Sequence, residues 1–151
     1  MKKVTFIIIA ALFTCCLSAC KSSSKATIDP NPVKLSDWVG KQWKLVELNG
    51  NPVEEGKSAK EPYIVLEIDD NRFHGNAGCN NMSGSYQSTD NGQITFHQVI
   101  ATRMMCLDMD IENKLLKMFD TVDSYTIKDD TLTLAKDKTT PLARFVAVPE
   151  P

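Results

Sequence analysis

The sequence predicts one mainly-β or α+β domain in which short antiparallel strands follow one another and the sheet curls to protect its edges. Three observations predict it. Several short runs between positions 43 and 148 alternate apolar and polar residues, as half-buried strands do. Most of these runs are joined by short turns rich in Asn, Asp and Gly. A clear helical period occurs at one place, between residues 108 and 122.

The expected strands each alternate apolar and polar side chains and end at turn signals. They comprise residues 43–48, 63–68, 72–74, 85–88, 93–100, 124–127, 131–134 and 142–148. The loop 89–92 ends in Asn-Gly, which predicts a hairpin between its two flanking strands. Residues 52–62 are polar with a proline at each end and predict a loop, whereas residues 75–84 predict a bend rich in Gly and Asn.

An amphipathic helix is expected over residues 108–122. Its apolar face consists of Ile111, Leu115, Met118, Phe119 and Val122. Asp108 or Asp110 can cap its N-terminus, and Glu112 in the first turn suits the helix dipole.

Length and charge exclude several classes of protein. The chain has 151 residues, with 17 Lys and Arg against 19 Asp and Glu and a formal net charge of −2. This length suits one domain and excludes a multi-domain enzyme. Nucleic acid is not expected as a partner, because no basic excess exists to neutralise phosphates.

The first 19 residues predict a lipoprotein signal peptide. Two lysines precede an apolar run at residues 4–13, which is too short to cross a membrane that needs about 20 apolar residues. Residues 17–20, Leu-Ser-Ala-Cys, look like a bacterial lipobox, which implies cleavage before Cys20 and its acylation with chains such as palmitate. The alternative is an ordinary signal peptide with a coincidental cysteine. Acyl chains on Cys20 hold a protein firmly at a membrane, since each buried CH₂ contributes about 0.8 kcal/mol.

Residues 20–34 predict a flexible tether, because they are rich in Ser and Pro and nearly free of large apolar side chains. The residue after the anchor is Lys21 rather than the Asp that retains lipoproteins in the inner membrane. We therefore expect anchoring in the outer membrane, facing the periplasm, with the folded domain over residues 35–149.

Cys79 and Cys106 are the cysteines that follow Cys20 in the chain, and in an exported protein they are expected to pair. The bridge would close a loop of about 28 residues and stabilise the fold by about 3–4 kcal/mol. A metal site would gather these two cysteines with His74 and His97, but the close ligand spacing of structural sites is missing. We expect no metal and no cofactor. A disulfide would also remove the nucleophile that a Cys/His enzyme needs.

The segment from Gly75 to Tyr86 is the most distinctive in the chain. Its glycines and asparagines permit positive φ angles and side-chain hydrogen bonds to the backbone, which predict a tight bend. It lacks the GxGxxG pattern of a dinucleotide loop and the Gly-Lys-Ser/Thr of a phosphate-binding loop.

Four segments carry a resemblance that covers about residues 36–148. They are Trp43-x-Leu45 leading to Asn49-Gly50, then Gly75-x-x-Gly78-Cys79-Asn80-x-x-x-Gly84-x-Tyr86, then Thr102-Arg103-Met104-x-Cys106, and finally Tyr125-x-Ile127 with Leu132-x-Leu134. Together they resemble the META domain family, the group that includes the HslJ-type heat-shock proteins of bacteria. The resemblance implies a strongly curved antiparallel β-sheet or partly open barrel, with one α-helix packed at its side or mouth.

The resemblance carries over no catalytic residue, since the family has none established, and we do not expect an enzyme. The motif residues are expected to have structural roles. They are Trp43, Gly75, Gly78, Asn80, Asn81, Gly84, Tyr86, Thr102 and Met104.

The expected function is that of a non-enzymatic, lipid-anchored lipoprotein with a role in cell-envelope integrity or stress. The resemblance implies this role, because family members are associated with heat or envelope stress and with novobiocin resistance in bacteria. The alternative is a module that binds a small apolar ligand, a lipid or an envelope protein. Met104, Met105 and Met118 would then line a site between sheet and helix, unless they only fill the core.

Overall fold

The computed structural model describes residues 38–149, so the expected signal peptide, Cys20 and the tether lie outside the described residues. Within this range there are nine strands: β1 (Gln42–Leu48), β2 (Asn51–Pro52), β3 (Tyr63–Leu66), β4 (Arg72–Asn76), β5 (Asn81–Thr89), β6 (Gln93–Ala101), β7 (Ser124–Lys128), β8 (Thr131–Lys136) and β9 (Thr140–Ala147). One helix, α1 (Asp110–Phe119), lies between β6 and β7 in the chain. The described part contains no helix that is long and apolar enough to cross a membrane.

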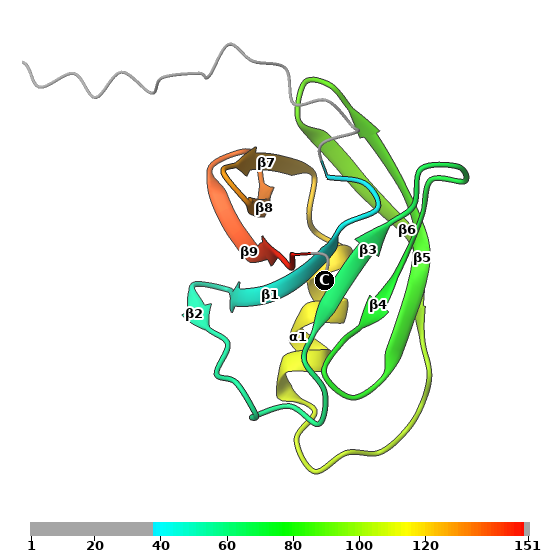
Figure 1. Ribbon diagram of the computed structural model, residues 1–151, viewed down its shortest axis with the longest axis vertical. Coiled ribbons are helices and arrows are strands. Elements are labelled where there is room, and N and C mark those ends of the chain that lie inside the picture. The colour runs from blue at the N-terminus through cyan, green and yellow to red at the C-terminus, as the bar shows by residue number, and fades with distance from the viewer. Residues whose placement is uncertain (1–37, 150–151) are drawn as a thin grey trace, which may run out of the picture.

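The strands form one antiparallel sheet that curves into a ring (Figure 1). Their order is β2-β1-β3-β4-β5-β6-β7-β8-β9, and β1 also pairs with β9 from Trp43 to Leu48. The weakest join is between β6 and β7, which share a single residue pair, Gln93 with Ser124. The expected mainly-β fold, a strongly curved antiparallel sheet with one helix, is confirmed.

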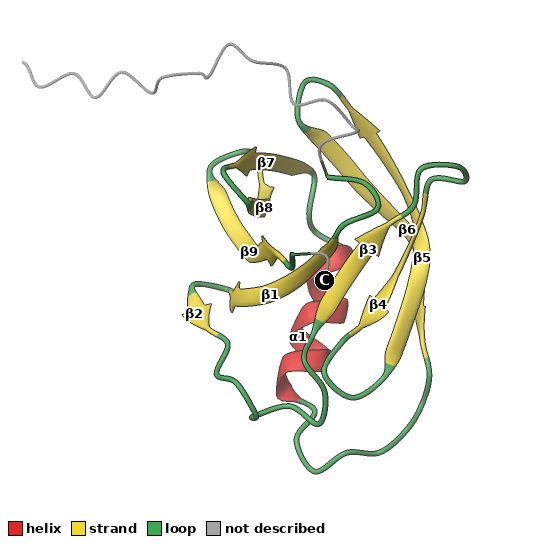
Figure 2. Cartoon of the chain, viewed as in Figure 1, coloured by secondary structure: helices red, strands yellow, loops and turns green. Residues whose placement is uncertain are grey.

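Helix α1 packs its apolar face against the inner face of the sheet (Figure 2). Phe119 contacts Phe73 of β4 and Phe96 of β6, with ring centroids 5.2 and 4.7 Å apart. Edge-to-face and tilted contacts of this kind stabilise a core beyond the area they bury. Leu115 and Met118 of the expected stripe are buried as well. The helical stripe and the alternation of the strands therefore meet in one core.

Three expected boundaries are wrong. The helix spans ten residues rather than the fifteen from 108 to 122, and its N-cap residue is Met109, which makes no side-chain capping bond. The Asp108 carboxylate instead accepts a hydrogen bond from the backbone N–H of Asp110 at 2.9 Å. Strand β3 ends at Leu66, so Ile68 is exposed instead of facing the core.

The bend expected over residues 75–84 is also shorter than predicted. Gly75 and Asn76 belong to β4, and β5 begins at Asn81, which leaves residues 77–80 as the bend. The physical reason is pairing across the sheet, because β5 is held between β4 and β6 and this overrides the weak strand preference of Gly and Asn.

Gly75 lies where β3 and β4 approach most closely. A Cβ placed on it would lie 2.0 Å from the backbone oxygen of Tyr63 and 3.1 Å from the Cα of Ile64. Both atoms belong to the backbone of a paired strand, so neither can move aside without breaking the β3–β4 ladder. Only glycine fits at this position.

We predict that Gly75→Ala lowers the free energy of unfolding by about 3 kcal/mol or more, because the added methyl group overlaps fixed backbone. Urea unfolding of the mature protein measures the change. Gly50→Ala is the matched control, since Gly50 has φ +77° but no atom within 4 Å of an added Cβ, and we expect it to cost about 1 kcal/mol. Equal unfolding midpoints for the two variants would contradict the close approach.

Candidate functional site

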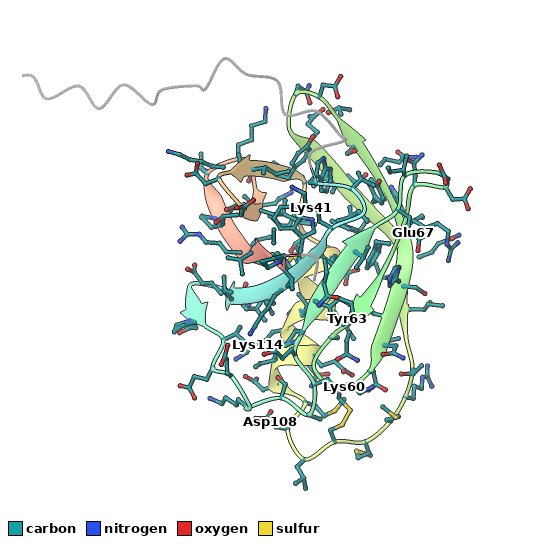
Figure 3. All side chains as sticks on the ribbon, in the orientation of Figure 1. Lys41, Lys60, Tyr63, Glu67, Asp108 and Lys114 are labelled. Carbon is teal, nitrogen blue, oxygen red and sulfur yellow. A yellow bond between two sulfur atoms is a disulfide. The ribbon has the colours of Figure 1, made fainter. Side chains whose placement is uncertain are left out.

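The bend 77–80 meets two later segments at one end of the domain: residues 102–106 after β6 and the first turn of α1, which follows soon after them. Figure 3 shows this region at the lower end of the molecule, where the disulfide appears as a yellow bond. We call the group formed by Cys79, Asn80, Thr102, Cys106 and Glu112 the bend cluster.

The bend itself is held by hydrogen bonds between neighbouring residues. Gly78 has φ +119°, a conformation that side chains rarely adopt, and its N–H donates to the side-chain oxygen of Asn76 at 2.8 Å. The N–H of Ala77 donates to the backbone oxygen of Asn80 at 2.8 Å. As a result, the backbone N–H groups of Cys79 and Asn80, which follow Gly78, point away from the bend and toward α1.

Glu112 receives those N–H groups. Its side chain is buried, with 4% of the residue exposed. Oε2 accepts hydrogen bonds from the backbone N–H of Cys79 at 3.2 Å and of Asn80 at 2.7 Å. Oε1 accepts a third from the side-chain amide of Asn80 at 2.7 Å. Three donors offset the cost of removing the carboxylate from water without any ion pair to Glu112 within residues 38–149.

The Asn80 side chain joins the bend to the segment after β6. Its oxygen accepts from the hydroxyl of Thr102 at 2.8 Å and from the N–H of Met104 at 2.7 Å. Its amide nitrogen donates to the oxygen of Met104 at 3.1 Å as well as to Glu112. The side chain thus uses two acceptor and two donor positions, its full capacity.

Cys79 and Cys106 are joined by a disulfide in the structure, with their Cα atoms 6.1 Å apart. Cys79 is buried beside the Glu112 carboxylate, and Cys106 lies on the segment that leads into α1. The bridge and the Asn80 hydrogen bonds act on the same segment, so both hold residues 102–106 against the bend. Neither sulfur is available as a nucleophile or a metal ligand in this form.

The remaining motif residues lie in the sheet and its core, outside the bend cluster. Trp43 is buried and donates from Nε1 to the backbone oxygen of Trp38 at 2.8 Å. Gly84 packs against the ring of Phe73. Tyr86 is buried, and its hydroxyl donates to the backbone oxygen of Glu67 at 3.0 Å. Burial raises the pKa of the Tyr86 hydroxyl above its ordinary value.

An open groove of about 540 Å³ borders the bend cluster. We call it the methionine groove. Its lining residues are Asn80, Val99, Ile100, Ala101, Thr102, Arg103, Met104, Met105, Met109, Glu112 and Leu116. Residues 99–105 form a continuous stretch of this lining from the end of β6 onward, and the rest comes from Asn80, Met109 and two residues of α1, Glu112 and Leu116.

Three methionines give the groove an adaptable apolar lining. Met105 is 94% exposed and Met104 is half exposed, which is unusual for long apolar side chains. Met109 completes the set. Met118 does not line the groove, as the binding-module alternative would require: it is 3% exposed and lies in the core, on the apolar face of α1 where the helical stripe predicts it.

The two histidines do not join the cysteines. His74 on β4 is exposed and contacts the carboxylate of Glu67 at 2.7 Å, while His97 on β6 is exposed and lies beside the hydroxyl of Thr95. Within the described range, no three His, Cys, Asp or Glu side chains are grouped so that they could hold a metal ion.

Sequence reasoning missed Glu112 and Met109 as site residues. Glu112 was expected only to interact with the helix dipole, yet its position one residue after the apolar Ile111 is on the edge of the helical stripe. Charged residues border the apolar face of most amphipathic helices, so Glu112 carries no sign of a buried partner in the sequence. Met109 is not on the apolar face of the expected helix, so the helical period does not mark it.

The META domain family model matches residues 34–149 of this chain. No curated protein matches the sequence. A protein whose structure was solved by NMR is 25% identical, with a TM-score of 0.59, and the match covers 76% of this chain and 95% of that one.

Two further solved structures are similar. An NMR structure of a protein from Burkholderia xenovorans is 21% identical with a TM-score of 0.64, and the match covers 86% of this chain and 97% of that one. The crystal structure of a DUF4847 family protein from Bacteroides vulgatus is 14% identical with a TM-score of 0.55, covering 77% of this chain and 98% of that one. At these identities the two structures are evidence for the fold alone.

We predict that Glu112→Ala lowers the free energy of unfolding by about 3 kcal/mol, because it leaves two backbone N–H groups and one amide without an acceptor in a buried place. Denaturant unfolding of the oxidised protein measures this loss. Asp110→Ala is the control: its carboxylate pairs with Lys114 at the surface, and its removal should cost well under about 1 kcal/mol. If the two variants are equally stable, Glu112 does not hold the bend.

We also predict that the paired variant Cys79→Ser with Cys106→Ser unfolds at lower urea concentration, with a loss of about 3–4 kcal/mol from the reopened loop. Adding a thiol reductant to the unsubstituted protein should give a loss of the same size. The double-serine variant should not respond to the reductant. An unchanged midpoint in both experiments would show that the bridge contributes nothing to stability.

Proposed function

The chain belongs to the META domain family, and we propose that it acts as a non-enzymatic, lipid-anchored protein of the bacterial cell envelope. The family expected from the four sequence segments is confirmed. In this proposal acyl chains on Cys20 hold the protein in the outer membrane, and the domain faces the periplasm. Its role is in envelope integrity or in tolerance of heat and antibiotic stress, as the resemblance to HslJ-type proteins implies.

The observation that carries the anchor is the segment Leu17-Ser18-Ala19-Cys20 after a basic head and a short apolar run. The distance between Cys20 and the start of the domain supports it. Residues 20–34, which are rich in Ser and Pro, are expected to form the tether between the two. A tether of that length allows the domain to stand clear of the membrane surface.

The chemistry of the bend cluster supports a role without catalysis. Its two cysteines are joined to each other, and its carboxylate is engaged by three N–H donors. Each group that could act as a nucleophile or base is thus already used to hold the structure together.

A second candidate function is that of a binding module, and the methionine groove favours it. Its volume of about 540 Å³ falls in the range of ligand sites, and its apolar lining is combined with the polar groups of Asn80 and Glu112 at one side. This function is compatible with the anchor, since a tethered domain can present the groove to a partner in the periplasm.

We predict that Cys20→Ala abolishes labelling with radioactive palmitate and moves the protein from the membrane fraction to the soluble periplasmic fraction, because the acylated thiol is lost. Cys16→Ala is the matched control. Cys16 lies in the expected signal peptide, four residues before the anchor, and its variant should keep both the label and the membrane location.

The same variants test the envelope role. In cells that lack the gene, growth under heat or novobiocin should be restored by the Cys16→Ala form and not by the Cys20→Ala form. Labelled Cys20→Ala protein in the membrane fraction would refute the anchor. Restoration by both forms would show that the role does not depend on it.

A further inference from the structure

The ring of strands leaves most of one edge of β6 without a neighbouring strand among the described residues. Strand β6 pairs with β5 over most of its length, but on its other edge it pairs with β7 only at Gln93. No other strand among residues 38–149 pairs with that edge. The C-terminal end of β6, at Val99–Ala101, is therefore a free edge, and the same three residues line the methionine groove.

The backbone of Ala101 points out from this free edge. The N–H of Thr102 donates to the backbone oxygen of Asn81 in β5 at 3.0 Å. Because successive residues of a strand direct their N–H and C=O groups to opposite edges, those of Ala101 point away from β5. They thus border the groove, and Ala101 is only partly buried.

The combination of a free edge and an apolar groove decides between two kinds of occupant. An acyl chain could fill the apolar space between Met104, Met109 and Leu116, but it would offer nothing to the N–H and C=O of Ala101. An extended peptide satisfies both, since its backbone pairs with the edge and alternate side chains enter the groove. The flexible methionines can adapt to different side chains.

The charge at the groove indicates the composition of such a peptide. Arg103 lines the groove just beyond the end of β6, is exposed, and pairs with no carboxylate among the described residues. A peptide antiparallel to β6 places its N-terminal end near Arg103, because β6 runs toward that residue. An acidic side chain at that end complements it.

We propose that the free edge of β6 and the methionine groove bind an extended segment of a partner protein by antiparallel strand addition. Apolar side chains of the segment occupy the groove, its backbone pairs with Ala101, and an acidic side chain near its N-terminal end meets Arg103. This inference deepens the binding-module function, on which it rests, and does not depend on the lipid anchor.

The test uses the mature, acylated protein in lipid nanodiscs and a displayed library of random linear peptides. We expect the enriched peptides to alternate apolar residues and to carry Asp or Glu toward the N-terminal end. Ala101→Pro, which removes the outward N–H without touching the β5 ladder, should weaken their binding about tenfold. Ala101→Ser keeps that N–H and is the matched control. Circular dichroism verifies that both variants are folded.

Two further measurements keep the test independent of the proline variant. Two methylated forms of an enriched peptide are compared, each with methyl groups on alternate backbone nitrogens. Methylation of the nitrogens that face β6 should abolish binding, whereas methylation of those on the opposite edge should leave binding unchanged. Arg103→Glu should weaken the binding of the acidic peptides and strengthen the binding of versions that carry Lys in place of the acidic residue.

Three results would overturn the proposal: no peptide is enriched, enriched peptides bind Ala101→Pro and Ala101→Ser equally, or methylation has no effect on either edge. A fluorescent fatty acid that binds the groove when no peptide is enriched would assign the groove to lipid, which preserves the binding-module function and refutes strand addition. Mass spectrometry of the same preparation reports acylation at Cys20, so failure of the anchor is seen separately.

Discussion

The carboxylate of Glu112 ties the first turn of α1 to the bend between β4 and β5, and the arrangement of this end of the domain depends on it. A buried carboxylate requires several N–H donors that point toward it. The bend supplies them because Gly78 adopts a positive φ and donates its N–H to the side-chain oxygen of Asn76, which fixes the direction of the following N–H groups. With the helix held at this end, its apolar face packs against the concave side of the sheet. The disulfide and the Asn80 hydrogen bonds then secure the segment that leads from β6 to the helix.

The same constraint explains why the groove lies where it does. Strand β6 stays paired with β5 as far as Ala101, and the chain then passes through the disulfide-bonded segment and α1 before β7, which pairs with β6 only at Gln93. The sheet is continuous elsewhere, from β1 through β9 and back to β1. An incompletely paired edge, apolar side chains and an exposed arginine therefore coincide at one end of the molecule.

Local patterns predicted the sheet and the helix well. Alternation located the strands in order, and the stripe located the helix, because both periods arise from backbone geometry that each residue experiences locally. The errors lie where pairing between distant segments decides. Asn81 to Gly84 joined β5 despite poor strand preference, and Ile68 fell outside β3.

Taken alone, the sequence determined the class of fold, the family segments, and the chemical identity of the residues at the bend. It also supplied the lipobox on which the anchor is proposed. Only the tertiary structure decided that Glu112 holds Cys79 and Asn80, that Met109 joins Met104 at a groove, and that β6 has a free edge beside it. The physical reason is distance along the chain. Glu112 and Asn80 are 32 residues apart, so no local period links them, and only the packing of helix against sheet brings donor and acceptor together.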